Sequence, residues 1–178
     1  MTKTLWKMDQ THSEIQFKAK HMIVSTVTGA FHQFEAQVET EGDDFEGAKI
    51  NFSADTASIS TGQEARDNHL KSDDFFNAEK YPKLIFESTN FKKISGQEYQ
   101  LKGNLTVREV KKAVEFEVEF GGKIKDPYGN TRVGFSLTGK INRKDYNLKW
   151  NALLESGNAV VSDEIKIFAN LEFTKVVN

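Results

Sequence analysis

The sequence predicts an all-β protein: one domain folded as an elongated, eight-stranded antiparallel β-barrel, with one or two short helices between residues 61 and 78. Three observations support this fold class. Apolar and charged side chains alternate along residues 113–124, the same alternation recurs elsewhere, and 14 phenylalanines stand beside only two prolines. Because phenylalanine favours strands and is costly to expose, so many rings need an interior.

Length and composition narrow the classes of function. The 178 residues fit a single domain spanning residues 1–178. With 24 Lys and Arg against 26 Asp and Glu, we expect no nucleic-acid partner and no overall attraction to acidic membranes. The absence of cysteine excludes disulfides, thiolate zinc sites and cysteine nucleophiles. No segment approaches the roughly 20 apolar residues of a membrane span, so a membrane-spanning protein is not expected.

The beginning of the sequence bears on location. Its first nine residues contain no apolar h-region of a signal peptide. This predicts a cytoplasmic protein, or a periplasmic one if the start is truncated.

The clearest strand signal lies in residues 113–124. One parity holds apolar side chains, namely Val114, Phe116, Val118, Phe120 and Ile124. The other parity holds Glu115, Glu117, Glu119 and Lys123. A period of two residues is typical of a strand with one dry face and one wet face.

The same pattern predicts the remaining strands in chain order. They are residues 15–21, 36–38, 50–54, 84–91, 101–107, 133–141 and 165–173, which with 113–124 make about eight strands. Glycine-rich or proline-containing turns separate several of them, at 41–44, 95–97 and 126–130. Strands joined so tightly are expected to form antiparallel hairpins.

Two segments break this rhythm. In residues 61–78, Ala65, His69 and Leu70 fall near helical spacing, which predicts the short helices. The segment 142–158 carries large aromatic residues, and we expect it to cover one mouth of the barrel.

A barrel of this size has a lumen that is either filled by side chains or holds one slender ligand. Glycines at 103, 134 and 139 lie within predicted strands. They indicate either strand coiling, which we favour, or places where side-chain bulk must be avoided.

The four histidines do not predict a metal site. His12 and His21 have opposite parity in an unbroken strand, and His32 and His69 lie in different irregular segments. His12 and Ser13 are adjacent, so in a strand they face opposite sides and do not pair as base and nucleophile. No phosphate-binding or dinucleotide-binding glycine motif is present, and no cofactor is expected.

Two residues are candidates for contact with a ligand head group. His21 has the inward parity near a strand end, where it meets either a ligand or the backbone and water of the rim. Arg143 follows a predicted strand and suits a bidentate bond to a carboxylate or phosphate. We favour a structural role for Arg143, as a latch to Asp67, Asp73 or Asp74.

Several motifs, weak singly and specific together, run in order along nearly the whole chain. They are Trp6 to Asp9, His12-Ser13-x-Ile15-x-Phe17, His21-Met22, Val27-x-Gly29-x-Phe31, Asp67-x-His69-Leu70-x-Ser72-x-Asp74-Phe75-Phe76, Tyr81-Pro82 with Phe86 and Ser88, Gly103-Asn104-Leu105-Thr106, and Asn142-Arg143-x-Asp145-Tyr146-x-Leu148-x-Trp150. With these motifs the chain resembles the YceI-like family of lipocalin-like barrel proteins. Asn147 and Glu109 depart from glycines that the family often has.

The resemblance implies an elongated barrel that holds a polyisoprenoid or other long-chain amphiphile, commonly as a homodimer and without catalysis. Combined with the inward parity, it gives our candidate ligand-binding residues: Ile15, Phe17, Ala19, His21, Phe31, Phe86, Leu101, Leu105, Phe116, Val118, Phe120, Phe135, Leu137, Ile165 and Ile167.

Three hypotheses for function follow. The first is non-enzymatic binding, storage or transport of a long-chain isoprenoid, such as a polyprenyl or quinone-like lipid, driven by burial of apolar area. The second is an enzyme that uses His21 or Arg143 on a lipid head group. The third is a stress-related interaction module with a filled lumen and no ligand.

Overall fold

The computed structural model describes residues 2–151 and 161–177. Within these ranges the chain forms β1 (Lys3–Met8), β2 (Glu14–His21), β3 (Ser25–Phe31), β4 (Phe34–Glu41), β5 (Asp44–Asp55), β6 (Ile59–Ser60), α1 (Glu64–Lys71), β7 (Lys83–Ser95), β8 (Glu98–Val107), β9 (Val110–Lys125), β10 (Thr131–Asn142) and β11 (Glu164–Lys175). Three short 3-10 turns are η1 (Gln10–His12), η2 (Thr56–Ser58) and η3 (Arg143–Tyr146). No helix among the described residues is long and apolar enough to cross a membrane.

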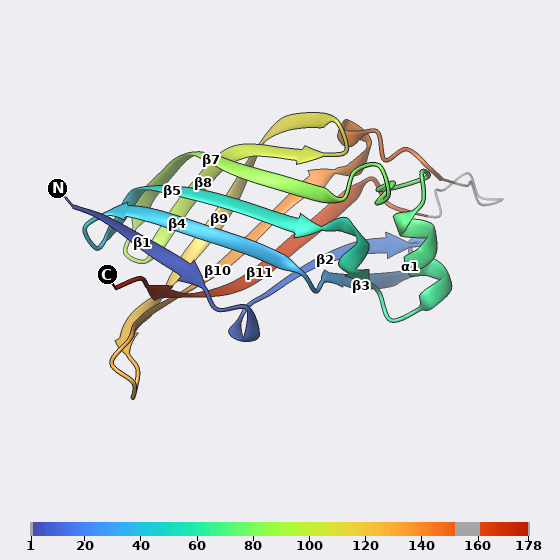
Figure 1. Cartoon of the computed structure of the whole chain (residues 1–178). Helices are drawn as coiled ribbons and strands as arrows, with labels where there is room; N and C mark the ends of the chain where they lie inside the picture. Colours follow the sequence, from blue (N-terminus) through green and yellow to red (C-terminus); the bar gives the residue numbers. More distant parts are fainter. Residues whose placement is uncertain (1, 152–160, 178) are drawn as a thin grey trace.

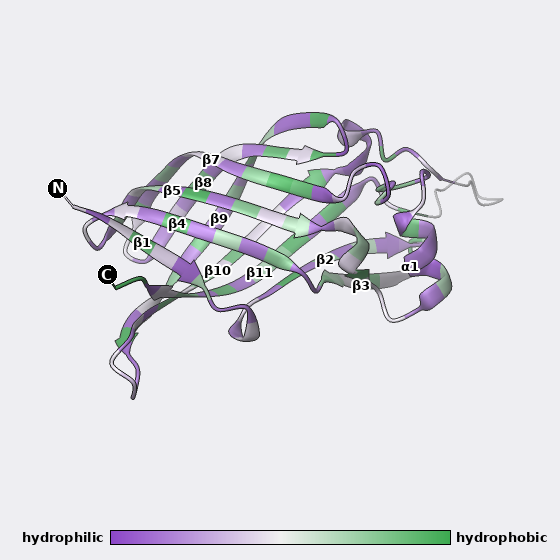
Figure 2. Cartoon of the chain, viewed as in Figure 1, coloured by the Kyte–Doolittle hydropathy of each residue, from purple (hydrophilic) through white to green (hydrophobic). Residues whose placement is uncertain are grey.

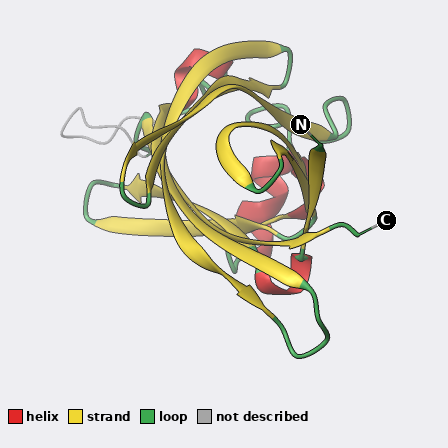
Figure 3. Ribbon diagram, turned by 90° about the vertical axis from the view of Figure 1, so that its left-hand side faces the viewer, coloured by secondary structure: helices red, strands yellow, loops and turns green. Residues whose placement is uncertain are grey.

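Eight of the strands close into the predicted antiparallel barrel. Their order is β1-β4-β5-β7-β8-β9-β10-β11, and β11 pairs back to β1. Figure 3 looks along this ring and shows α1 behind it. Figure 1 places both termini at one end of the barrel and α1 at the other. The all-β barrel predicted from the alternation is confirmed, and one α-helix, α1, lies between residues 61 and 78.

The ring is completed by a strand that the sequence analysis did not identify. This strand is β1, which pairs with β11 near Phe173. η1 then separates β1 from β2, and β2 pairs with a different part of β11, near Ala169. β2 continues outward into β3 and β6. These two strands were also missed, since β3 is rich in threonine and lacks a clear apolar alternation and β6 has two residues.

The predicted alternation of dry and wet faces is present in the structure. On β9, Phe116 and Val118 are buried, whereas Glu115, Glu117 and Glu119 are exposed. Figure 2 shows apolar and polar residues alternating along most of the barrel strands. The inward parity was therefore assigned correctly for the central part of β9.

The prediction that Ile124 faces inward is wrong. β9 and β10 shift register between Gly134 and Phe135, because Phe135 pairs with Phe120 while Gly134 pairs with Gly122. The bulge adds one residue to β9 and reverses the parity beyond it. Ile124 is therefore 65% exposed.

The strand glycines serve different purposes. A Cβ atom at Gly139 would lie 2.2 Å from the ring of Phe116, and one at Gly103 would lie 2.4 Å from the carbonyl oxygen of Glu87. Our preference for strand coiling is wrong at these two positions, where bulk is excluded. A Cβ atom at Gly134 would meet nothing, and this glycine lies at the bulge.

An aromatic cluster closes the barrel at the end that holds the termini. Its members are Trp6, Phe45, Phe91, Tyr99, Phe120, Phe135 and Phe173, whose neighbouring ring centroids lie 4.8 to 6.3 Å apart. Trp6 is fully buried, and its Nε1 donates to the hydroxyl of Thr40 at 3.0 Å. Rings of this size in contact leave little free volume at that end of the lumen.

Candidate ligand-binding cavity

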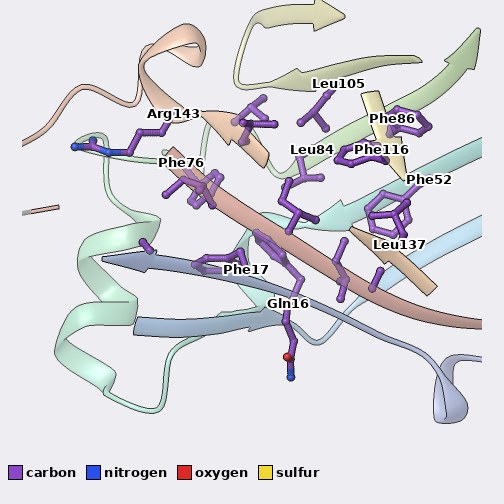
Figure 4. A pocket seen from close by; sticks show the side chains of 18 of the residues that line it. Gln16, Phe17, Phe52, Phe76, Leu84, Phe86, Leu105, Phe116, Leu137 and Arg143 are labelled. Atoms are coloured by element: carbon purple, nitrogen blue, oxygen red, sulfur yellow. The ribbon is translucent and has the colours of Figure 1, made fainter. Parts of the chain in front are cut away.

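The barrel encloses a cavity of about 520 Å³. It extends from the aromatic cluster toward α1, and Figure 4 shows its apolar side chains converging from several strands. Ligand pockets commonly measure about 300 to 1,000 Å³, so the cavity falls within the range of ligand-binding pockets.

The cavity is where the inward parity placed it. Fourteen of the candidate residues line it: Ile15, Phe17, Ala19, His21, Phe31, Phe86, Leu101, Leu105, Phe116, Val118, Phe135, Leu137, Ile165 and Ile167. The exception is Phe120, whose ring packs on Phe45 and Phe135 within the aromatic cluster. Phe120 therefore helps to close the barrel and does not line the cavity.

The lumen is hollow. Phe17, Leu137 and Ile167 point into the barrel, yet each remains partly exposed, because no side chain fills the space before them. Apolar atoms dominate the cavity wall. This does not agree with the third hypothesis, which expects a filled lumen.

Polar lining residues gather at the α1 end. Thr61, Gln63, Arg66 and His69 come from the α1 region, Lys20 and His21 from the end of β2, and Arg143 from η3. Gln16 also borders the cavity, but Figure 4 shows its side chain pointing away. The cavity is therefore apolar along its length and polar at one end, which we call the mouth.

The α1 side of the mouth was missed by sequence reasoning. The ring of His69 lies 4.6 Å from Trp150 and 5.1 Å from Phe75, and its Nε2 is 2.8 Å from Asp74. The signal was present in the motif that contains His69, Leu70 and Phe75, although its spacing alone did not show which end it covers. Up to Asn151, the segment 142–158 covers the mouth as expected, and its residues 152–158 lie outside the described ranges.

Arg143 is a buried latch. Its residue is 2% exposed, and burial lowers the pKa of its guanidinium. Four of its N–H donors reach backbone carbonyls, those of Ser162 (2.9 Å), Leu148 (2.6 Å), Trp150 (2.8 Å) and Val161 (3.2 Å). Arg143 thus ties η3 and the segment after it to the start of β11.

The predicted role of Arg143 is present, but its predicted partners are wrong. Its carboxylate neighbour is Asp163, at 3.8 Å. The three expected partners are engaged elsewhere: Asp67 with Thr61, Asp73 with Arg108 and Asp74 with His69. With four donors committed to carbonyls, Arg143 has little capacity left for a ligand phosphate.

Other basic groups at the mouth are less constrained. Arg66 donates to the hydroxyl and carbonyl oxygens of Thr61, and no ion pair is found for it within residues 2–151 and 161–177. The imidazole of His21 lines the cavity and makes no hydrogen bond to another described residue. The mouth thus presents positive charge and hydrogen-bond donors.

A second hollow, of about 660 Å³, lies on the outer face of β8, β9 and β10. Its wall includes the exposed side chains of Glu115, Glu117 and Lys140. A shallow hollow with a mixed polar wall removes little ligand surface from water, so the inner cavity is the better candidate.

One group of possible metal ligands lies outside the barrel. Ligand atoms of Asp9, His12 and Glu172 lie within 4.8 Å of one another. The guanidinium of Arg132 contacts Asp9 at 2.8 Å and Glu172 at 3.1 Å, and Asp9 raises the pKa of His12. Because the guanidinium of Arg132 already pairs with both carboxylates, the group is better explained as an ion-pair network that joins η1 to β10 and β11.

Arg132 also pairs with Asp126, at 2.7 Å, and this ion pair predicts that the fold loses stability in acid. Arg132 and the backbone amides of Asn130 and Tyr128 lower the pKa of Asp126 from 3.8 to about 2. A carboxyl whose pKa is lower in the folded state stabilises the fold above its unfolded pKa, and this contribution disappears between about pH 4 and pH 2. We therefore expect the urea midpoint to fall over that range, and to fall less in Asp126→Asn.

The matched control is Glu119→Gln, which changes an exposed carboxylate on β9. It should keep the acid dependence of the unmodified protein. An equally steep decline in Asp126→Asn and in the unmodified protein would contradict this assignment.

Together, the fold and the cavity define a class: closed antiparallel barrels with an apolar interior that opens through a polar mouth. Within that class the chain belongs to the YceI-like family, because the family model for the YceI-like domain matches residues 6–173. The resemblance noted from the motifs is confirmed. A UPF0312 protein of Staphylococcus aureus strain N315 is 38% identical over 172 residues, which cover 96% of this chain and 98% of the relative.

Solved structures agree with this assignment. A Campylobacter jejuni YceI protein is 31% identical, with a TM-score of 0.75 over 89% of this chain and 90% of its own. Burkholderia cenocepacia BcnA superimposes with a TM-score of 0.80 at 23% identity, covering 93% of this chain and 98% of its own. A polyisoprenoid-binding domain from Saccharophagus degradans does so with a TM-score of 0.72 at 16% identity, covering 95% and 97%. At these low identities the last two show a shared fold.

Proposed function

We propose that this protein is a non-enzymatic carrier or store for a long-chain isoprenoid or similar amphiphilic lipid, and that it acts as a homodimer. The observation that carries the proposal is the hollow, apolar lumen of about 520 Å³ with its polar groups confined to one end. A single hydrocarbon chain with a polar head group matches that distribution. The family resemblance, and the polyisoprenoid-binding domain of the same fold, support an isoprenoid in particular.

Burial of apolar area supplies the driving force. Each Å² removed from water contributes about 25 cal/mol, so a chain that buries several hundred Å² gains several kcal/mol even after the ordering cost. Affinity should therefore depend on chain length more than on head-group identity.

The direction of binding follows from the two ends of the cavity. The aromatic cluster, which includes Trp6 and Phe173, closes the end near the termini. The α1 end carries Arg66, His69 and His21. We propose that the hydrocarbon tail points to the aromatic cluster and that the head group stays at the mouth.

The geometry does not support catalysis by His21 or Arg143, the two residues of the second hypothesis. Arg143 is committed to backbone carbonyls, and His21 has no carboxylate partner among the described side chains. A general base is usually oriented by a second group, and this pair lacks such an arrangement.

A bulky residue in the lumen should block ligand uptake. Leu137 lines the cavity on β10, and its neighbour Thr138 faces outward. We expect Leu137→Trp to reduce binding of a fluorescent prenyl probe at least about tenfold, since overlap with the chain removes contact area. Thr138→Trp, which adds the same ring outside the barrel, should bind the probe normally.

Mass spectrometry of solvent extracts from the purified protein supplies the second measurement. A co-purifying long-chain lipid is expected from the unmodified protein and from Thr138→Trp, with less from Leu137→Trp. The absence of extracted lipid, together with no probe uptake by the unmodified protein, would overturn the proposal.

A further inference from the structure

The turn between β2 and β3 exposes three consecutive apolar side chains. Met22 is 43% exposed, Ile23 is 58% exposed and Val24 is 87% exposed. Because His21 pairs with Ser25, these three residues form the tip of the hairpin, which we call the 22–24 tip. Adjacent apolar residues on a surface commonly mark a contact with a protein or a membrane.

The requirements of the turn do not explain these residues. Met22 has a φ of 52° and Ile23 a φ of 68°, both in the left-handed region. Glycine and asparagine adopt this conformation readily, whereas a β-branched residue there is an outlier. These apolar side chains lower the stability of the fold, because they are exposed to water and because two of them lie in a left-handed backbone conformation. Their presence therefore indicates a functional contact rather than a structural role.

The tip lies at the mouth of the cavity. Lys20 and His21, which directly precede it, both line the cavity. In Figure 1 the β2–β3 hairpin ends beside α1, at the end of the barrel opposite the termini. A surface that contacts the tip would therefore face the opening through which we propose the lipid passes.

The charge of the hairpin favours an anionic surface. Residues 15–34 contain Lys18, Lys20 and two histidines, with no Asp or Glu. The Nζ atom of Lys20 donates to Thr26, and neither lysine forms an ion pair within the described parts of the chain. The whole chain has a net charge of −2, so attraction to acidic lipid requires a local excess of positive charge, and this hairpin has one.

We propose that the 22–24 tip inserts into the head-group region of an anionic lipid bilayer and sets the cavity mouth against the membrane. Interfacial amphipathic helices bind by burying apolar side chains at the head-group boundary while Lys and Arg attract anionic lipid, and the 22–24 tip with its lysines offers the same chemistry. This inference rests on the proposed function for its purpose, because a lipid ligand must enter from a membrane. Its test is separate, since vesicle binding is measured without following uptake into the cavity.

Vesicle flotation tests the proposal. We expect the unmodified protein to float with phosphatidylcholine vesicles that contain phosphatidylglycerol, and to do so less well in high salt. Val24→Asp should weaken this binding at least about tenfold, because it removes an apolar side chain that the bilayer would bury and adds a charge that anionic lipid repels. The matched control is Ile124→Asp, which changes a 65% exposed isoleucine at the end of β9, beside the turn into β10, and should leave binding unchanged. Figure 1 shows that turn at the end of the barrel away from α1.

Ile23→Gly separates a membrane role from a structural one. Glycine suits the left-handed φ, so the melting temperature should stay the same or rise while vesicle binding falls. Unchanged vesicle binding in both Val24→Asp and Ile23→Gly would overturn the proposal. The proposal would also be overturned if the variants became monomeric but still bound vesicles, because the tip would then be a contact between two copies of the chain.

Solution uptake of the prenyl probe distinguishes the two proposals. If the unmodified protein takes up the probe but does not bind vesicles, the insertion of the tip is wrong and the carrier function stands. If it binds vesicles through the tip but takes up no probe, the carrier function fails alone.

Discussion

Replacing Phe116 with aspartate is expected to unfold the protein or reduce its free energy of unfolding by about 4 kcal/mol or more. The side chain is 6% exposed, and its ring lies 5.8 Å from that of Phe86 and against Gly139. The substitution removes a large apolar group and places a carboxylate where no described cationic side chain pairs with it. Urea unfolding followed by circular dichroism measures the change.

Two further variants make this result specific. Glu117→Lys alters the charge of the next residue, which is exposed on the outer face of β9, and should change stability by about 0.5 kcal/mol or less. Phe116→Leu keeps an apolar group and should fold, with a smaller loss and altered probe binding. Equal destabilisation by Phe116→Asp and Glu117→Lys would show that the inward and outward faces of β9 are assigned wrongly.

The central part of β9 was predictable because its signal is local. From Val114 to Phe120, the polarity of each side chain predicts which face of the strand it lies on. In a paired strand the faces alternate residue by residue unless a bulge interrupts the pairing. The bulge at Gly121 and Gly122 depends on pairing with β10, a partner that lies farther along the chain. For this reason the exposure of Ile124 could not be read from β9 alone.

Closure of the barrel shows the same limit. The parity of residues 15–21 correctly identified an inward face, yet that strand does not complete the ring. β1 completes the ring by pairing with β4 and β11. Which distant strands pair with one another cannot be read from the sequence of either strand alone. The number of strands in the ring was predicted, and the identity of one of them was not.

The site was predictable in its apolar part and less so at its mouth. Inward parity found most of the lining residues because the cavity wall is the inner face of the strands, and Phe31 was found through the family motif. Arg66 and His69 reach the mouth from α1, whose position depends on tertiary packing. The partners of Arg143 were missed for a further reason: they are backbone carbonyls, which every residue possesses and which composition therefore does not reveal.

Replacing Arg143 with methionine is expected to reduce the free energy of unfolding by about 3 to 5 kcal/mol. Methionine fills much of the space but donates no hydrogen bond, so the carbonyls of Ser162, Leu148, Trp150 and Val161 lose a partner together. Arg143→Lys should recover only part of the loss, because an ammonium lacks the planar arrangement of five donors.

The neighbouring Lys144 provides the control for charge. It pairs with Asp163 at 3.4 Å while 48% exposed, and Lys144→Met should cost less than about 1 kcal/mol because exposed ion pairs contribute little. The same variants separate the two roles considered for Arg143. If Arg143 is a structural latch, Arg143→Met lowers the free energy of unfolding because the four carbonyl hydrogen bonds are lost, and it does so with or without bound lipid. If Arg143→Met instead retained its stability but bound the prenyl probe more weakly, Arg143 would be a head-group contact and the latch would be wrong.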